Sequence, residues 1–171
     1  MRRIITIFIL AILSFLIQSA IFSYHNVMGS APNLLLILTM SFGIMRGRRE
    51  GLLVGVLSGF LYDIFFGSFI GPYMLLFMII GYLNGAFHKD FLMEDIMLPV
   101  FIIAFDELVF NLVVYIASFL LRNRTDLGFY FIHVFLPQVF YTIVATVVVY
   151  RFNVWLNKFL KKKVKENATT I

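Results

Sequence analysis

The sequence has no cysteine, and only 13% of its 171 residues are charged. The lack of cysteine excludes disulfide bonds and thiolate metal sites. In ordinary soluble domains about a quarter of the residues are charged. In this chain the charged fraction is lower, and 61% of the residues are hydrophobic. The composition therefore excludes an ordinary soluble domain and indicates a chain that folds in lipid.

Long apolar runs, separated by short polar turns, take the place of the missing charge. Without water, backbone groups must pair within helices or a closed barrel, and these runs lack the alternating polar residues of a barrel. We predict an all-α integral membrane protein with about six transmembrane helices in one compact bundle, a single multi-pass domain over residues 1–171. The predicted spans are about 4–22, 32–45, 51–66, 72–87, 96–121 and 129–156, ended by a basic cytoplasmic tail, 157–171.

Lysine and arginine are unevenly distributed among the predicted turns. Only Arg122 and Arg124 fall on one side of the membrane. On the other side lie Arg2, Arg3, Arg46, Arg48, Arg49, Lys89, Arg151, Lys158, Lys161, Lys162, Lys163 and Lys165. Because basic residues favour the cytoplasmic side, we predict a protein of the bacterial cytoplasmic membrane with both termini in the cytoplasm. The net charge of +5 is interpreted as contact with membrane lipids, and no nucleic acid partner is predicted.

Catalytic and cofactor motifs are missing from the sequence. There is no HExxH motif, no phosphate-binding loop and no dinucleotide fingerprint. The three histidines, His25, His88 and His133, lie far apart along the chain. We therefore predict no enzyme activity, no cofactor and no metal site.

Glycine recurs at every fourth position of the predicted third helix, and an acid ends the series: Gly51, Gly55, Gly59 and Asp63. At 3.6 residues per turn, these residues share one face of the helix. Small residues at this spacing let another helix approach closely, so we predict a packing surface for a helix of this protein or of a partner. Asp63 lies toward the outer end, where it could bind a partner or simply reach interfacial water.

Two adjacent acids, Asp106 and Glu107, fall deep inside the predicted fifth helix, with Asn111 one turn beyond Glu107. Charged groups at this depth need polar partners, because the hydrocarbon offers none. Candidate partners on other helices are Gln18, His133 and Gln138. Structural pairing, a proton or cation pathway, and contact with a partner protein all remain open for these acids.

A series of short motifs resembles the MreD family of rod shape-determining membrane proteins. In order they are Pro32-Asn33-Leu34-Leu35-Leu36, a basic turn, Gly51-x3-Gly55-x3-Gly59-Phe60-Leu61-Tyr62-Asp63 and Gly67-x3-Gly71. The family often carries an acid after the proline that begins the second helix, where this chain has Asn33. Pro32 and Asn33 form an outer-end motif, and in this chain the motif lacks the charge that the family often carries there.

The resemblance implies a non-enzymatic component of the bacterial cell-elongation (rod) complex, which links the cytoskeleton to peptidoglycan synthesis and maintains cell shape. It implies MreC as a partner and, through MreC, MreB, RodA and a class B penicillin-binding protein. It also implies a helical arrangement similar to the substrate-binding subunits of energy-coupling-factor transporters. The alternatives are a vitamin-binding transporter subunit of that architecture, or a proton-coupled transporter or intramembrane enzyme centred on Asp106 and Glu107.

Overall fold

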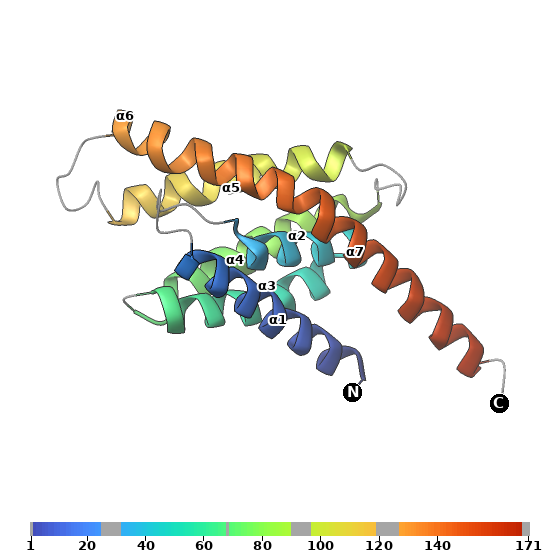
Figure 1. Cartoon of the computed structure of the whole chain (residues 1–171). Helices are drawn as coiled ribbons and strands as arrows, with labels where there is room; N and C mark the ends of the chain where they lie inside the picture. The colour runs from blue at the N-terminus through green and yellow to red at the C-terminus, as the bar shows by residue number, and fades with distance from the viewer. Residues whose placement is uncertain (1, 25–31, 68, 90–96, 119–126, 169–171) are drawn as a thin grey trace.

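The computed structural model describes residues 2–24, 32–67, 69–89, 97–118 and 127–168. Within these ranges every element is helical, which confirms the prediction of an all-α fold (Figure 1). The elements are α1 (Arg2–Tyr24), α2 (Leu34–Arg46), α3 (Arg48–Phe66), α4 (Pro72–Asn84), the 3-10 segment η1 (Gly85–Lys89), α5 (Met97–Ser118), α6 (Leu127–Tyr130), the π-helical segment η3 (Phe131–Phe135) and α7 (Leu136–Ala168).

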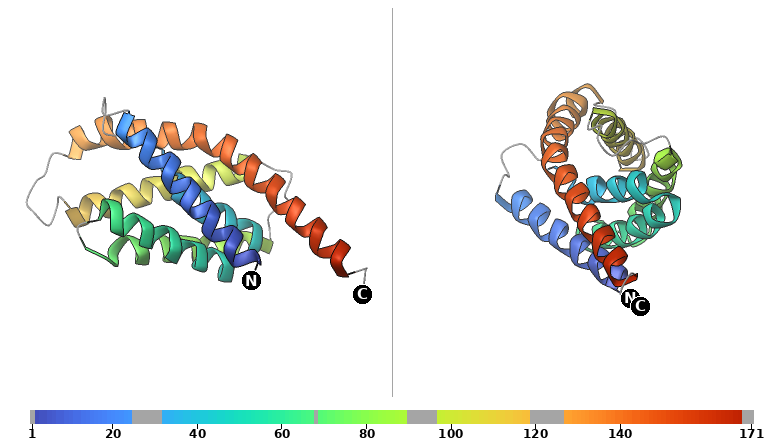
Figure 2. Two further views of the ribbon diagram at one scale, coloured as in Figure 1. Left: turned by 60° about the horizontal axis from the view of Figure 1, so that its bottom comes forward. Right: turned by 90° about the vertical axis from the view of Figure 1, so that its right-hand side faces the viewer.

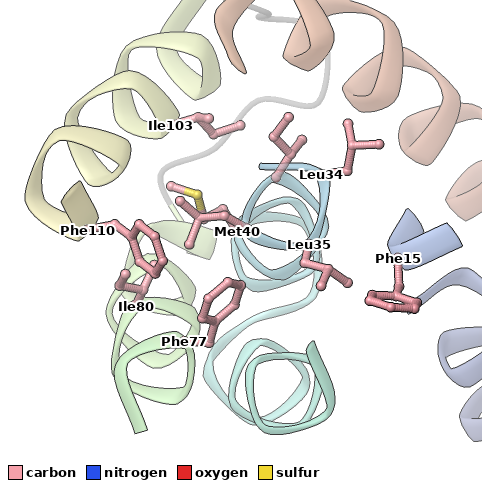
Figure 3. Close-up of a cluster of buried hydrophobic side chains, with 10 residues drawn as sticks. Phe15, Leu34, Leu35, Met40, Phe77, Ile80, Ile103 and Phe110 are labelled. Atoms are coloured by element: carbon pink, nitrogen blue, oxygen red, sulfur yellow. The ribbon is translucent and has the colours of Figure 1, made fainter. Parts of the chain in front are cut away.

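Helix α2 lies at the centre of the bundle, in contact with α1, α3, α4, α5 and α7 (Figures 1 and 2). Every residue from Leu34 to Met45 is buried. This stretch is apolar on all sides and carries no charge before Arg46, which is the pattern of a helix enclosed by others. Figure 3 shows the cluster that surrounds it, with Leu34, Leu35 and Met40 of α2 among Phe15, Phe77, Ile80, Ile103 and Phe110.

Helices α3 and α4 form an antiparallel pair whose backbones touch at the glycines of α3. A methyl group on Gly51 would overlap the carbonyl oxygen of Gly81, and one on Gly55 would overlap that of Phe77. A methyl group on Gly59 would overlap the α-carbon of Met74. The glycine face predicted from sequence therefore lies against α4 of the same chain.

The last helical stretch, from α6 to α7, contains a π-helical turn. α6, η3 and α7 follow one another without a break, and the π-helical turn of η3 ends just before Pro137. Proline has no N–H for the helical ladder, and local π winding is one of the adjustments by which membrane helices satisfy the backbone groups that a proline leaves free. The described chain holds two stretches that are long and apolar enough to cross a membrane, Met97–Ala117 and Phe131–Phe152. The total of six spans stays a prediction.

Helix α7 continues past the predicted end of the last span, near Leu156, to Ala168. For the basic segment, the sequence left open a charged stop of the helix or a basic amphipathic helix on anionic lipid. Lysine is a good helix former, however, and no glycine or proline follows Pro137. The segment predicted to be a tail is thus largely helical, and it projects beyond the bundle in line with the rest of α7 (Figures 1 and 2).

We expect Gly55→Ala to lower the free energy of unfolding in detergent by about 1–3 kcal/mol, the usual cost of overpacking a close contact. The added methyl meets backbone atoms of Phe77, which cannot move without shifting α4. Reversible unfolding followed by circular dichroism measures the change. Leu53→Ala is the matched control, because Leu53 lies on the exposed side of α3. Equal stability of Gly55→Ala and the wild type would contradict the close contact.

Candidate functional site

Asp63 binds the beginning of α4 with both of its carboxylate oxygens. Oδ2 accepts hydrogen bonds from the backbone N–H groups of Gly71 (2.8 Å) and Met74 (2.9 Å). Oδ1 accepts one from the N–H of Tyr73 (3.0 Å). The first N–H groups of a helix have no partner within the helix, and a negative charge beside them is favourable. Asp63 is therefore the N-terminal cap of a neighbouring helix.

Sequence analysis considered a partner protein or interfacial water beside Asp63. In the structure, the backbone of its own chain surrounds the carboxylate. The side chain is only 2% exposed, so it does not reach water in the described structure. Its oxygens already accept three hydrogen bonds from its own chain. The donors are backbone groups of another helix, which carry no signature in the sequence.

The beginning of α2 is held by side chains from three places. The N–H of Leu35 donates to Oε1 of Gln18 on α1 (3.1 Å), and the N–H of Leu36 donates to Oδ1 of Asn33 (3.2 Å). The N–H of Asn33 itself donates to Oγ1 of Thr142 on α7 (3.3 Å). Pro32, the other residue of the outer-end motif, accepts a hydrogen bond from Leu34. The neutral amide of Asn33 thus supplies a helix cap without the charge that the resemblance would lead one to expect.

The first residues of α2 lie well inside the bundle. Thr142, which meets Asn33, is about 20 Å along the helical stretch that begins at Leu127, taking 1.5 Å per residue. α2 itself has 13 residues and is therefore about 20 Å long. A helix that begins this deep cannot rely on water for its free N–H groups, which explains why Gln18, Asn33 and Thr142 surround it.

The adjacent acids of α5 point to different neighbours, as two consecutive positions on a helix must. Nδ2 of Asn84, the last residue of α4, donates to Oδ2 of Asp106 at 2.6 Å. Nε2 of Gln138 on α7 donates to Oε1 of Glu107 at 2.7 Å, and Nδ2 of Asn111 lies 3.5 Å from the same oxygen. The pair therefore connects α5 to α4 on one side and to α7 on the other.

Some candidate partners named from sequence meet these acids and others do not. Gln138 was among the candidates and binds Glu107, whereas Gln18 binds α2 and His133 lies near the carbonyl oxygen of Phe129. Asn84 was missed. Asn84 could have been found from the sequence, because it is a lone amide within a long apolar run. A polar group in such a run needs a polar partner.

Buried polar atoms without a hydrogen-bond partner among the described residues include Oε2 of Glu107, Nδ2 of Asn33 and Oγ of Ser58. Glu107 binds Gln138, and Asn33 binds Thr142. Gln138 and Thr142 lie on neighbouring turns of α7. Such a carboxyl oxygen can carry a proton or bind a water molecule. In the described part of the chain, no group of three or more acidic or histidine side chains is arranged to hold a metal ion.

The family of the protein follows from a comparison with family models. The model of rod shape-determining protein MreD matches residues 1–163, nearly the whole chain. The chain belongs to the MreD family. Membership gives it a role in determining rod shape and makes it a membrane protein, in a family of shape-determining proteins that is not known for enzymatic activity. No curated protein and no solved structure matches the chain.

We expect Asp63→Ala to destabilise the start of α4 by at least about 1–2 kcal/mol, the usual cost of losing a helix cap. Hydrogen exchange at Gly71, Tyr73 and Met74 should accelerate, because their N–H groups lose their acceptors. Asp63→Asn, which keeps one acceptor oxygen, should fall between the alanine variant and the wild type. Unchanged exchange at all three amides in Asp63→Ala would show that the cap is not formed.

A double-mutant cycle tests the contact between α5 and α7. Glu107→Leu should be less stable than Glu107→Gln, because only glutamine keeps an acceptor for Gln138. The coupling between Glu107→Leu and Gln138→Leu should be about 0.5–2 kcal/mol, the range measured for polar contacts between membrane helices. Asp106→Leu should couple much more weakly to Gln138→Leu, because Asp106 binds α4. Strict additivity of the Glu107 and Gln138 variants would contradict the contact.

Proposed function

We propose that this protein is a non-enzymatic component of the bacterial rod complex, which helps to link the cytoskeleton to peptidoglycan synthesis and so maintains cell shape. It crosses the cytoplasmic membrane several times, with both termini in the cytoplasm. Its direct partner is MreC, and through MreC it is connected to MreB, RodA and a class B penicillin-binding protein. Family membership supports the role in shape, and the form of α7 supports the linking role.

Helix α7 is the element suited to make such a link. Its outer half is fixed to the bundle, since Thr142 and Gln138 bind α2 and α5, and Tyr150 is fully buried. Beyond Tyr150 the helix continues without interruption to Ala168, about 27 Å at 1.5 Å per residue. A continuous helix transmits a displacement from one end to the other, whereas a flexible tail does not.

The contact with MreC falls on a surface other than the glycine face. Gly51, Gly55 and Gly59 already lie against the backbone of α4, with no space for another helix between them. A partner helix therefore meets one of the apolar outer sides of the bundle. Asp106 and Glu107, bound to Asn84 and Gln138, serve to hold α5 in place for that contact.

A helix-breaking substitution tests the link through α7. We expect Asn157→Pro to accumulate in the membrane but to give rounded cells, because a proline inside a helix costs about 3 kcal/mol and kinks or breaks it. All basic residues of the C-terminal segment remain, so the orientation signal is unchanged. Each variant is expressed in cells depleted of the native protein, and cell length, cell width and membrane abundance are measured.

Asn157→Ala is the matched control, because it removes the same side chain and keeps the helix; it should restore rods. Recovery of MreC with the affinity-tagged protein is measured in the same membranes. Normal rods with Asn157→Pro would show that a continuous α7 is not needed for the link. Failure of MreC to accompany even the wild-type chain would contradict the proposed place in the complex.

A further inference from the structure

Asp106 is partly exposed on the outside of the bundle, although its neighbour in the sequence, Glu107, is fully buried. Glu107 is bound to amides of α5 and α7 within the bundle. For Asp106, the described residues provide one hydrogen bond, from Asn84 to Oδ2, and none to Oδ1. Asn84 thus satisfies one oxygen of the carboxyl group, and the other is left to whatever surrounds the bundle.

The position of Asp106 along α5 places it far from both membrane surfaces. The apolar stretch Met97–Ala117 has 21 residues and is long enough to cross a membrane. At 1.5 Å per residue, Asp106 lies about 14 Å from the beginning of this stretch and about 17 Å from its end. The hydrocarbon layer is about 30 Å thick. A helix of this length that crosses the layer therefore holds Asp106 near its middle.

Apolar side chains surround Asp106 on this outer surface. Ile102 and Val109, one turn before and after it on α5, are also partly exposed. Phe105 beside it is 66% exposed, and Leu83, near the end of α4, is 57% exposed. We call these four residues, together with Asp106, the Asp106 surface. Lipid acyl chains have no hydrogen-bond donor, so contact with lipid alone would leave a carboxyl oxygen unpaired in hydrocarbon, which is costly.

A second copy of the chain does not supply the missing donor. Four amide side chains of the described helices are buried: those of Gln18, Asn33, Asn84 and Asn111. The amide of Gln138 is bound to Glu107. Lysine and arginine occur only at or beyond the ends of the apolar stretches. Among the described side chains, therefore, no amide, lysine or arginine lies exposed at the depth of Asp106.

We propose that the Asp106 surface is the contact site for a transmembrane helix of another protein, which carries an amide or basic side chain near the middle of the membrane and donates it to Asp106. A basic side chain at that depth is itself costly in lipid unless it meets an acid, so the contact satisfies both helices. The apolar side chains around Asp106 pack against the rest of the partner helix. The inference deepens the proposed function and rests on it only in placing the protein in a membrane complex.

Photo-crosslinking in native membranes tests the contact. The full-length, affinity-tagged protein carries p-benzoylphenylalanine in place of Phe105, an exposed aromatic residue that it resembles in shape. The same replacement at Phe8, which is exposed on α1, is the control, because α1 packs against α2 and α3. We expect illumination to join position 105 to a transmembrane peptide of another protein that contains an amide or basic residue. Position 8 should not be joined to the same peptide.

Variants of Asp106 and Asn84 separate partner binding from support of the fold. In the chain labelled at position 105, Asp106→Leu should lower the crosslinking yield, corrected for membrane abundance, about three- to tenfold, the loss of one polar contact between membrane helices. Asp106→Asn keeps an acceptor oxygen and should retain most of the yield. Asn84→Ala removes the internal hydrogen bond of Asp106 and leaves its carboxyl group, so the yield should stay high.

Equal losses of yield in Asp106→Leu and Asn84→Ala would overturn the proposal, because Asp106 would then act only through the fold. Crosslinks from position 105 to lipid alone, or to a second copy of the chain, would overturn it as well. If Asp106→Leu does not accumulate, leucine in place of the donor residue in the crosslinked partner peptide provides the same test with this chain unchanged.

The experiment also separates this contact from the proposed function. Recovery of MreC with the tagged protein, but with no protein crosslinked to position 105, would contradict the contact and leave the proposed function standing. A crosslink that depends on Asp106 but leads to a protein outside the rod complex would support the contact and contradict the proposed function.

Discussion

The backbone contact between α3 and α4 determines where the other features of the bundle lie. Since lipid tails are as apolar as leucine, membrane helices gain little from hiding apolar surface against each other, and close packing contributes in its place. Gly51, Gly55 and Gly59 allow that packing along the length of α3. The same contact brings Asp63 beside the first residues of α4, where three N–H groups need an acceptor.

The other helices are joined at a few polar points that lie within apolar surroundings. Gln18 connects α1 to α2, Thr142 connects α7 to α2, and the two acids of α5 connect it to α4 and α7. In hydrocarbon each such group lacks water as an alternative partner, so a shifted helix would leave it unsatisfied. These contacts therefore set the register of the helices, while the apolar side chains fill the space between them.

The glycine face could be predicted from the sequence, because a four-residue spacing defines one side of a helix whatever lies beside it. The neighbouring helix could not be predicted, since the spacing identifies a face and not the helix that packs against it. For Asp63 the missing information was of another kind: its donors are backbone groups of α4, which any residue provides. The contact of Glu107 with Gln138 could be predicted from the sequence, because both are polar side chains in apolar runs. The form of the end of α7 could not be decided from the sequence, because a basic segment fits both a charged stop and an amphipathic helix.

The contacts between helices form in an order that depends on how far apart the contacting residues are in the sequence. The α3–α4 contact joins neighbouring helices, so it can form as soon as both have been synthesised, and local contacts form early in folding. The bond between Asn33 and Thr142 spans 109 residues and must wait for α7. Until that last helix arrives, Glu107 lacks its contact with Gln138, and the N–H of Asn33 lacks Thr142 as its acceptor. The nascent protein thus passes through a stage with unpaired polar groups in lipid, a state open to recognition by membrane chaperones and proteases, and completion of α7 ends that exposure.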